Sequence, residues 1–232
     1  MPGRVPPSLV VTVVLSLLVA AGALVGADAL RLQAARTAQA ASTSAQSETK
    51  PVGPSGCLQE PCRVLGTAAI GGTSMELVAD AGAQSGRLRI GGGTATPQVI
   101  PVTVTDNGVV LTEDSLQCLA GGQAACLIRG RRADNRVYGQ VVVGRADSWA
   151  SGQTYLSNAG YLALANVDSD VSPEVLAAQP GCAGGCPGGQ VRMQVFNLDG
   201  SVVGCTRNYS ALERLPGFPV VKLTQAELSA CK

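Results

Sequence analysis

Apolar and polar side chains alternate in short runs along residues 57–232. Alternation with a period of two residues is typical of strands that bury one face. The clearest runs are Thr73–Asp80, Arg136–Gly144 and Val191–Gly200. Turn dipeptides such as Asn107-Gly108 and Asp199-Gly200 lie among the apolar runs and favour short antiparallel strands. The pattern predicts a mainly β domain, with helix expected only in the amino-terminal segment and in Thr224–Cys231.

The amino-terminal segment has a different pattern. Ser8–Leu30 is predominantly apolar and has one charge, Asp28, near its end. As a helix, its 23 residues would extend about 34 Å, which is enough to cross a hydrocarbon core of about 30 Å. We predict an uncleaved signal-anchor helix in the lipid bilayer. The alternative is a secreted protein, since Ala27–Ala29 and Ala38–Ala40 both resemble signal-peptide cleavage sites.

The flanks of this segment complete the predicted organisation. Residues 1–7 would form a cytoplasmic tail, and residues 31–56 a helical extension that passes into a flexible, Pro- and Gly-containing tether. Gly22 and Gly26 form a GxxxG spacing, which brings two membrane helices together in some homodimers.

All eight cysteines follow the tether, and none forms a C-x-x-C motif. Their spacing suggests four local disulfides between near neighbours: Cys57–Cys62, Cys118–Cys126, Cys182–Cys186 and Cys205–Cys231. Because disulfides persist in oxidising compartments, we expect residues 57–232 to lie outside the cytoplasm and the amino terminus to lie inside. The protein would then cross the cell membrane once.

The first three cysteine pairs recur at intervals of about sixty residues, and each is followed by a strand-like run. A repeat of this length fits four-stranded propeller blades. A propeller usually closes with four or more blades, and residues 57–232 hold only three units of this length. A β-sandwich or a barrel therefore remains the alternative architecture.

The segment from Asn166 to Ala178, NVDSDVSPEVLAA, places oxygen-bearing side chains at alternate positions and continues into an apolar run. Calcium takes six to eight oxygen ligands, and alternate residues of a tight loop can direct their oxygens to one centre. The candidate ligands are Asn166, Asp168, Asp170, Ser172 and Glu174.

This segment resembles the FG-GAP/VCBS repeat of integrin-type β-propellers, over about residues 161–205. Asp168, Asp170, Pro173 and Glu174 match the acidic loop of that repeat, which implies a propeller blade and a structural calcium ion. Two residues depart from the pattern. Asn166 replaces the first acid, and Val171 replaces the glycine of the sharp turn.

Composition narrows the functional classes. The chain has no histidine, which excludes Ser–His–Asp and Cys–His nucleophile systems and histidine-ligated metals. The net charge of +1 and the lack of a dense basic cluster argue against nucleic-acid binding, and we interpret Arg129–Arg136 as a solvated turn. The Ala/Gly/Val/Arg-rich composition suggests a bacterial origin.

The sequence thus favours a non-enzymatic binding, scaffold or sensing protein of a bacterial envelope, with an envelope protein or a glycan as partner. The alternative is an envelope hydrolase that uses carboxylates and a structural calcium ion. No other cofactor is expected.

Overall fold

A computed structural model of the chain describes residues 57–91, 97–145, 148–168, 172–182 and 189–231. The predicted tail, anchor helix 8–30, extension, tether and Gly22/Gly26 contact therefore lie outside the described residues. Within the described ranges, no helix combines the length and apolarity needed to cross a membrane.

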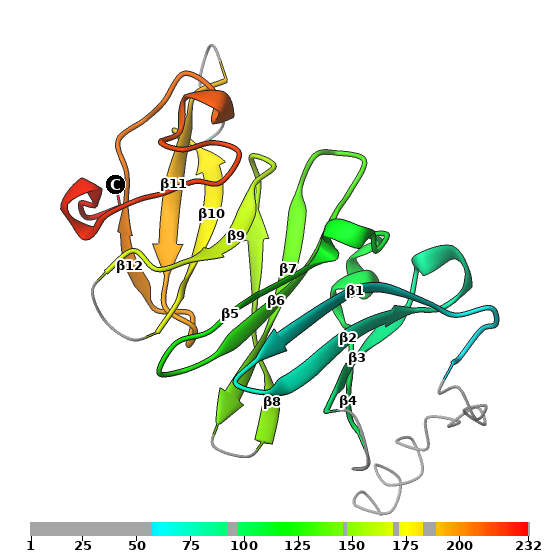
Figure 1. Cartoon of the computed structure of the whole chain (residues 1–232). Helices are drawn as coiled ribbons and strands as arrows, with labels where there is room; N and C mark the ends of the chain where they lie inside the picture. Colours follow the sequence, from blue (N-terminus) through cyan, green and yellow to red (C-terminus); the bar gives the residue numbers. More distant parts are fainter. Residues whose placement is uncertain (1–56, 92–96, 146–147, 169–171, 183–188, 232) are drawn as a thin grey trace, which may run out of the picture. The chain divides into compact units, whose positions relative to one another are not determined.

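The described residues form three antiparallel sheets of four strands each (Figure 1). In each sheet the strands pair in chain order, so every sheet is a simple meander. Sheet A contains β1 (Arg63–Ile70), β2 (Thr73–Ala79), β3 (Gly86–Ile90) and β4 (Gln98–Pro101). Sheet B contains β5 (Leu116–Leu119), β6 (Ala125–Arg131), β7 (Val137–Arg145) and β8 (Ser148–Ser157). Sheet C contains β9 (Leu162–Ala165), β10 (Glu174–Pro180), β11 (Val191–Phe196) and β12 (Val202–Cys205).

Alternation along the strands places sheet B between two cores. On β6, Ile128 faces sheet A and packs in a cluster with Met75 and Leu88. The neighbouring Leu127 faces sheet C and packs in a second cluster with Leu164. Both faces of β6 are therefore buried, which explains its continuous apolar run.

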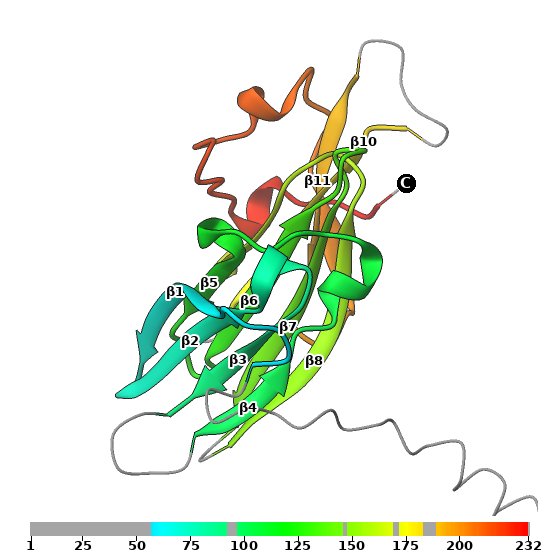
Figure 2. The same ribbon diagram turned by 90° about the vertical axis from the view of Figure 1, so that its right-hand side faces the viewer.

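The far face of sheet C is covered by the carboxy-terminal segment, which lies alongside β10 and β11 in Figure 2. Leu215, Val221 and Leu223 of that segment pack on Met193 and Val195 of β11. Only short 3₁₀ turns interrupt the segment, η4 (Leu212–Arg214) and η5 (Gln225–Glu227).

The predicted mainly β fold of disulfide-stapled antiparallel strands is confirmed, but the helix expected over Thr224–Cys231 was wrong. That stretch contains only the three-residue turn η5. Its end is instead extended, because Ser229 and Cys205 exchange two backbone hydrogen bonds of 2.8 and 2.9 Å and Cys231 is bonded to Cys205.

The regular spacing of the cysteine pairs along the chain does not place them at equivalent positions in the three sheets. Cys57–Cys62 precedes β1, Cys118–Cys126 joins β5 to β6, and Cys182 follows β10. The three pairs thus occupy different places in their sheets. What the sheets share is their strand order, and their first strands lie in contact in succession, β1 with β5 and β5 with β9.

Candidate binding site

The predicted disulfides are confirmed for three pairs, with Cys57–Cys62, Cys118–Cys126 and Cys205–Cys231 bonded. Cys182 is also disulfide-bonded, and residue 186 lies outside the described residues. No cysteine in the described part of the chain is free.

The acidic loop is only partly described, because residue 170 falls outside the described ranges. Asn166 is exposed and Asp168 is half-buried, whereas Glu174 at the start of β10 is only 1% exposed. One carboxylate oxygen of Glu174 accepts the backbone N–H of Val167 at 2.7 Å. The structure thus brings Glu174 back to the beginning of the loop, and the calcium site stays a prediction.

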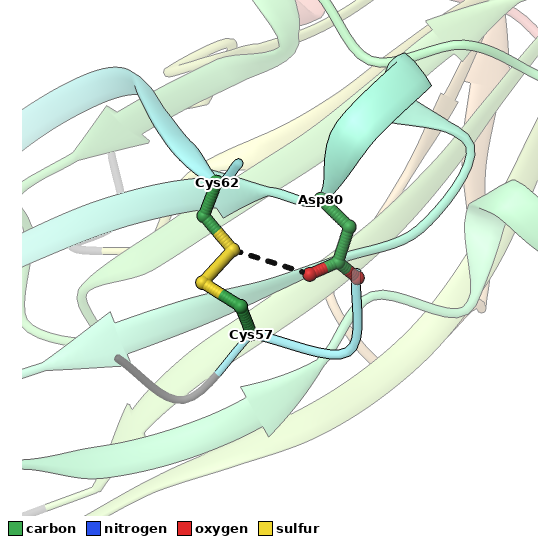
Figure 3. Close-up of side chains that lie close together, drawn as sticks. All are labelled: Cys57, Cys62 and Asp80. Atoms are coloured by element: carbon green, nitrogen blue, oxygen red, sulfur yellow. Dashed lines mark hydrogen bonds between the residues drawn. A yellow bond between two sulfur atoms is a disulfide. The ribbon is translucent and has the colours of Figure 1, made fainter. Parts of the chain in front are cut away.

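Asp80 is a second carboxylate that the fold buries, next to the Cys57–Cys62 disulfide (Figure 3). It pairs with Arg87 and accepts hydrogen bonds from the Leu58 N–H at 3.0 Å and the Ser85 hydroxyl at 2.6 Å. The Cys62 sulfur lies 3.4 Å from Oδ1 of Asp80.

Burial alone would raise the pKa of Asp80. The hydrogen bonds from Ser85 and Leu58 and the charge of Arg87 outweigh that effect and lower the pKa below its ordinary value.

Cys57, Cys62 and Asp80 are a group of three metal-type side chains, among the described residues, whose ligand atoms lie within 4.8 Å of one another. Because the two sulfurs are joined to each other, they offer no thiolate, and Arg87 already neutralises the carboxylate. The cluster therefore anchors the first disulfide loop on sheet A.

A pocket of about 520 Å³ lies where sheets B and C meet at the ends of β6 and β9. We call it the arginine pocket. Its volume falls within the usual range for small-molecule sites. Its walls include Asp114, Ser115, Arg129, Arg131, Tyr161 and Leu162.

The alternation of β6 places both arginines in this pocket. Arg129 and Arg131 follow Leu127 at two-residue steps, so they share the face that packs on sheet C. The first strand of sheet C, β9, begins at Leu162, and the two guanidiniums contact the backbone at and just before that residue. Arg129 donates to the Leu162 carbonyl, and Arg131 donates to the Gly160 carbonyl at 2.7 Å.

Two glycines make this arrangement sterically feasible. At Gly160 the φ angle is 85°, and a Cβ atom would lie 2.8 Å from Nη1 of Arg131. At Gly130 a Cβ atom would lie 2.7 Å from the Val109 side chain, which packs over the opposite face of β6. Gly130 therefore allows the 109–112 segment to close one wall of the pocket.

The pocket is electropositive. Arg87 pairs with Asp80, Arg89 with Glu76, and Arg132 and Arg136 with Asp134, whereas neither Arg129 nor Arg131 forms an ion pair with a described residue. Burial lowers the pKa of Arg129, and the Arg131 charge acts in the same direction, while Tyr161 and Asp114 oppose the shift. Arginine nevertheless stays protonated, so two like charges are held side by side.

The interpretation of Arg129–Arg136 as a solvated turn was correct for Arg132 and Arg136, whose partner Asp134 is on the turn. It missed that the half-buried Arg129 and the exposed Arg131 line a pocket. The sequence feature that could have indicated this is the two-residue spacing of Arg129 and Arg131 from the apolar Leu127, which places all three on one face of a strand.

A second hollow, of about 340 Å³ beside β8, contains Arg145 and Asp199, whose charges are opposite. The arginine pocket is therefore the better candidate for recognising a charged ligand. No family model, curated protein or solved structure matches this chain.

Proposed function

We propose that this protein is a membrane-anchored, extracytoplasmic binding protein of a bacterial envelope that has no catalytic activity and takes its ligand in the arginine pocket. The pocket carries the proposal, because its two guanidiniums are fixed by backbone carbonyls and lack a carboxylate partner among the described residues. Such rigid donors at the rim of packed sheets are suited to recognition.

The proposed compartment is supported by the cysteines and the amino-terminal segment. Every cysteine in the described residues is disulfide-bonded, which is typical of oxidising compartments. The apolar segment Ser8–Leu30 precedes the domain and would anchor it to the bilayer with the amino terminus inside.

A likeness to propeller blades is part of the proposal. It is supported by three four-stranded meanders whose first strands lie in contact. The partner would be an envelope glycan or an envelope protein.

The compartment is tested by expressing the full chain in a bacterium and treating spheroplasts with a protease that does not cross the membrane. We expect residues 57–232 to be cleaved, while a cytoplasmic marker protein stays intact. Thiol alkylation of the denatured chain should label cysteines only after reduction. Labelling before reduction, or protection from the protease until lysis, would overturn the proposed location.

A further inference from the structure

We propose that the arginine pocket binds the carboxylate of a small polar ligand through Arg129 and Arg131. This inference rests on the proposed binding function and adds the chemical class of the ligand. Three features of the pocket support it: unused N–H donors, a small net positive charge, and walls of mixed polarity.

The unused donors follow from the hydrogen bonds of the two guanidiniums, each of which has five N–H groups. Arg129 uses two, to the backbone carbonyls of Leu162 and Asp114. Arg131 uses two, to the Gly160 carbonyl and the Asn135 side chain. Five minus two leaves three N–H groups on each guanidinium with no acceptor among the described residues.

The bonds that are made also fix the orientation of the guanidiniums. Both arginines bond to the entry of β9, at Gly160 and Leu162, so their planes are set before a ligand arrives. A planar carboxylate can then accept two N–H bonds without much loss of side-chain entropy.

The charge of the pocket favours a monoanion. Arg129 and Arg131 contribute two positive charges and Asp114 contributes one negative charge, which leaves +1. A carboxylate neutralises this charge, whereas a phosphate dianion would leave an excess negative charge beside Asp114.

The remaining walls suit an organic acid with hydroxyl or amide groups. Val110, Val137 and Leu162 are apolar, and Thr112 and Ser115 carry hydroxyls. The carboxylate could belong to an acidic sugar or to the end of a peptide, and both present the same group to the arginines.

The test uses the full chain in detergent micelles, labelled with ¹⁵N, and follows the arginine Nε–Hε signals by NMR at constant ionic strength. The probes are acetate, glucuronate and N-acetylalanine, with glucose as the neutral counterpart of glucuronate and inorganic phosphate as the dianion. We expect the carboxylates to shift two arginine signals saturably and glucose to shift neither. Tighter binding of glucuronate or of N-acetylalanine would identify a sugar or a peptide source.

Variants of pocket residues test whether the shifted NMR signals report binding in the arginine pocket. Arg131→Gln should weaken carboxylate binding at least about tenfold, because a charge-assisted hydrogen bond is lost. Arg136→Gln is the matched control, since it removes the same charge from the adjacent turn, where Arg136 pairs with Asp134. Asp114→Asn should strengthen binding about threefold by removing a nearby negative charge. Asp114 is exposed, so this variant does not depend on the folding of Arg131→Gln.

The inference is overturned if none of the carboxylates saturates the signals, if phosphate binds more tightly than they do, or if Asp114→Asn weakens binding. Glucose binding without carboxylate binding would overturn the ligand class and leave the binding function standing. Carboxylate binding in a chain whose domain proves cytoplasmic would overturn the proposed location and leave the site standing.

Discussion

The side-chain amide of Gln117 on β5 pairs with the backbone of Leu164 on β9 as a neighbouring strand would. Its Nε2 donates to the Leu164 carbonyl at 2.9 Å, and its Oε1 accepts the Leu164 N–H at 3.0 Å. β9 is the edge strand of sheet C, so this glutamine from sheet B satisfies backbone groups that would otherwise be open. Gln98 of β4 forms the same pair of bonds with Trp149 of β8.

Replacing Gln117 with alanine should lower the free energy of unfolding by about 1–3 kcal/mol, because the Leu164 N–H and C=O lose their partner. Urea unfolding of the full chain in detergent measures the difference. Gln153→Ala, at an exposed position of β8, is the matched control and should stay within about 0.5 kcal/mol of the parent. Equal costs for the two variants would show that the amide bridge contributes nothing.

A Gln117→Glu variant tests the same bridge through pH. The carboxylate can accept the Leu164 N–H but cannot donate to the Leu164 carbonyl, whereas the protonated acid can do both. Folding should therefore raise the pKa of this carboxyl, and the variant should gain stability relative to the parent as the pH falls through that pKa. A pH-independent difference between Gln117→Glu and the parent would contradict the assignment of donor and acceptor.

The amide bridges show where sequence patterns stop being informative. Alternation predicted β11 because a half-buried strand shows its burial pattern in its own residues, and the apolar run of β7 likewise reflects burial of that strand on both faces. Gln117 and Leu164 are 47 residues apart, and nothing near either residue indicates the other. Short disulfides such as Cys118–Cys126 were predictable since proximity along the chain was enough.

The arginine pocket needed the same kind of long-range information. Arg129 continues the apolar face of β6, yet its exposure depends on where sheet C begins, 33 residues later at Leu162. The sequence could indicate a basic stretch but not which of its arginines line a pocket.

The Asp80–Arg87 pair should be far more sensitive to mutation than a surface pair. Asp80→Ala leaves the buried Arg87 without its partner and should cost about 3–5 kcal/mol of unfolding free energy. Glu76→Ala breaks the exposed Arg89–Glu76 pair at 3.5 Å and should cost no more than about 1 kcal/mol. Urea unfolding compares the two. The double variant Asp80→Ala/Arg87→Met should recover part of the loss, and no recovery would contradict an uncompensated charge as its cause.

Acid should weaken the domain through Asp80 in a predictable direction. Because folding lowers the pKa of Asp80, the unfolded state binds more protons than the folded state around the ordinary value of 3.8. The stabilisation is therefore present above that pH and is lost as the pH falls through the folded-state pKa. Unfolding free energies measured from neutral pH downwards should converge for the parent and Asp80→Asn below pH 3.8. Parallel curves for the two proteins would rule out Asp80 as the responsible group.

Glu174 allows the hydrogen-bonding role of the acidic loop to be separated from calcium binding. Its carboxylate already accepts the Val167 N–H, so Glu174→Ala should cost about 1–3 kcal/mol even in the presence of a calcium chelator. Glu174→Gln retains an acceptor oxygen and should cost less, while Glu213→Ala, an exposed acid on the carboxy-terminal segment, should be nearly neutral. Urea unfolding of the parent and the three variants, with chelator and with added calcium, measures these costs. If the Glu174→Ala cost appears only with calcium, the carboxylate acts as a metal ligand, as the FG-GAP/VCBS resemblance implies, and the hydrogen bond to Val167 is secondary.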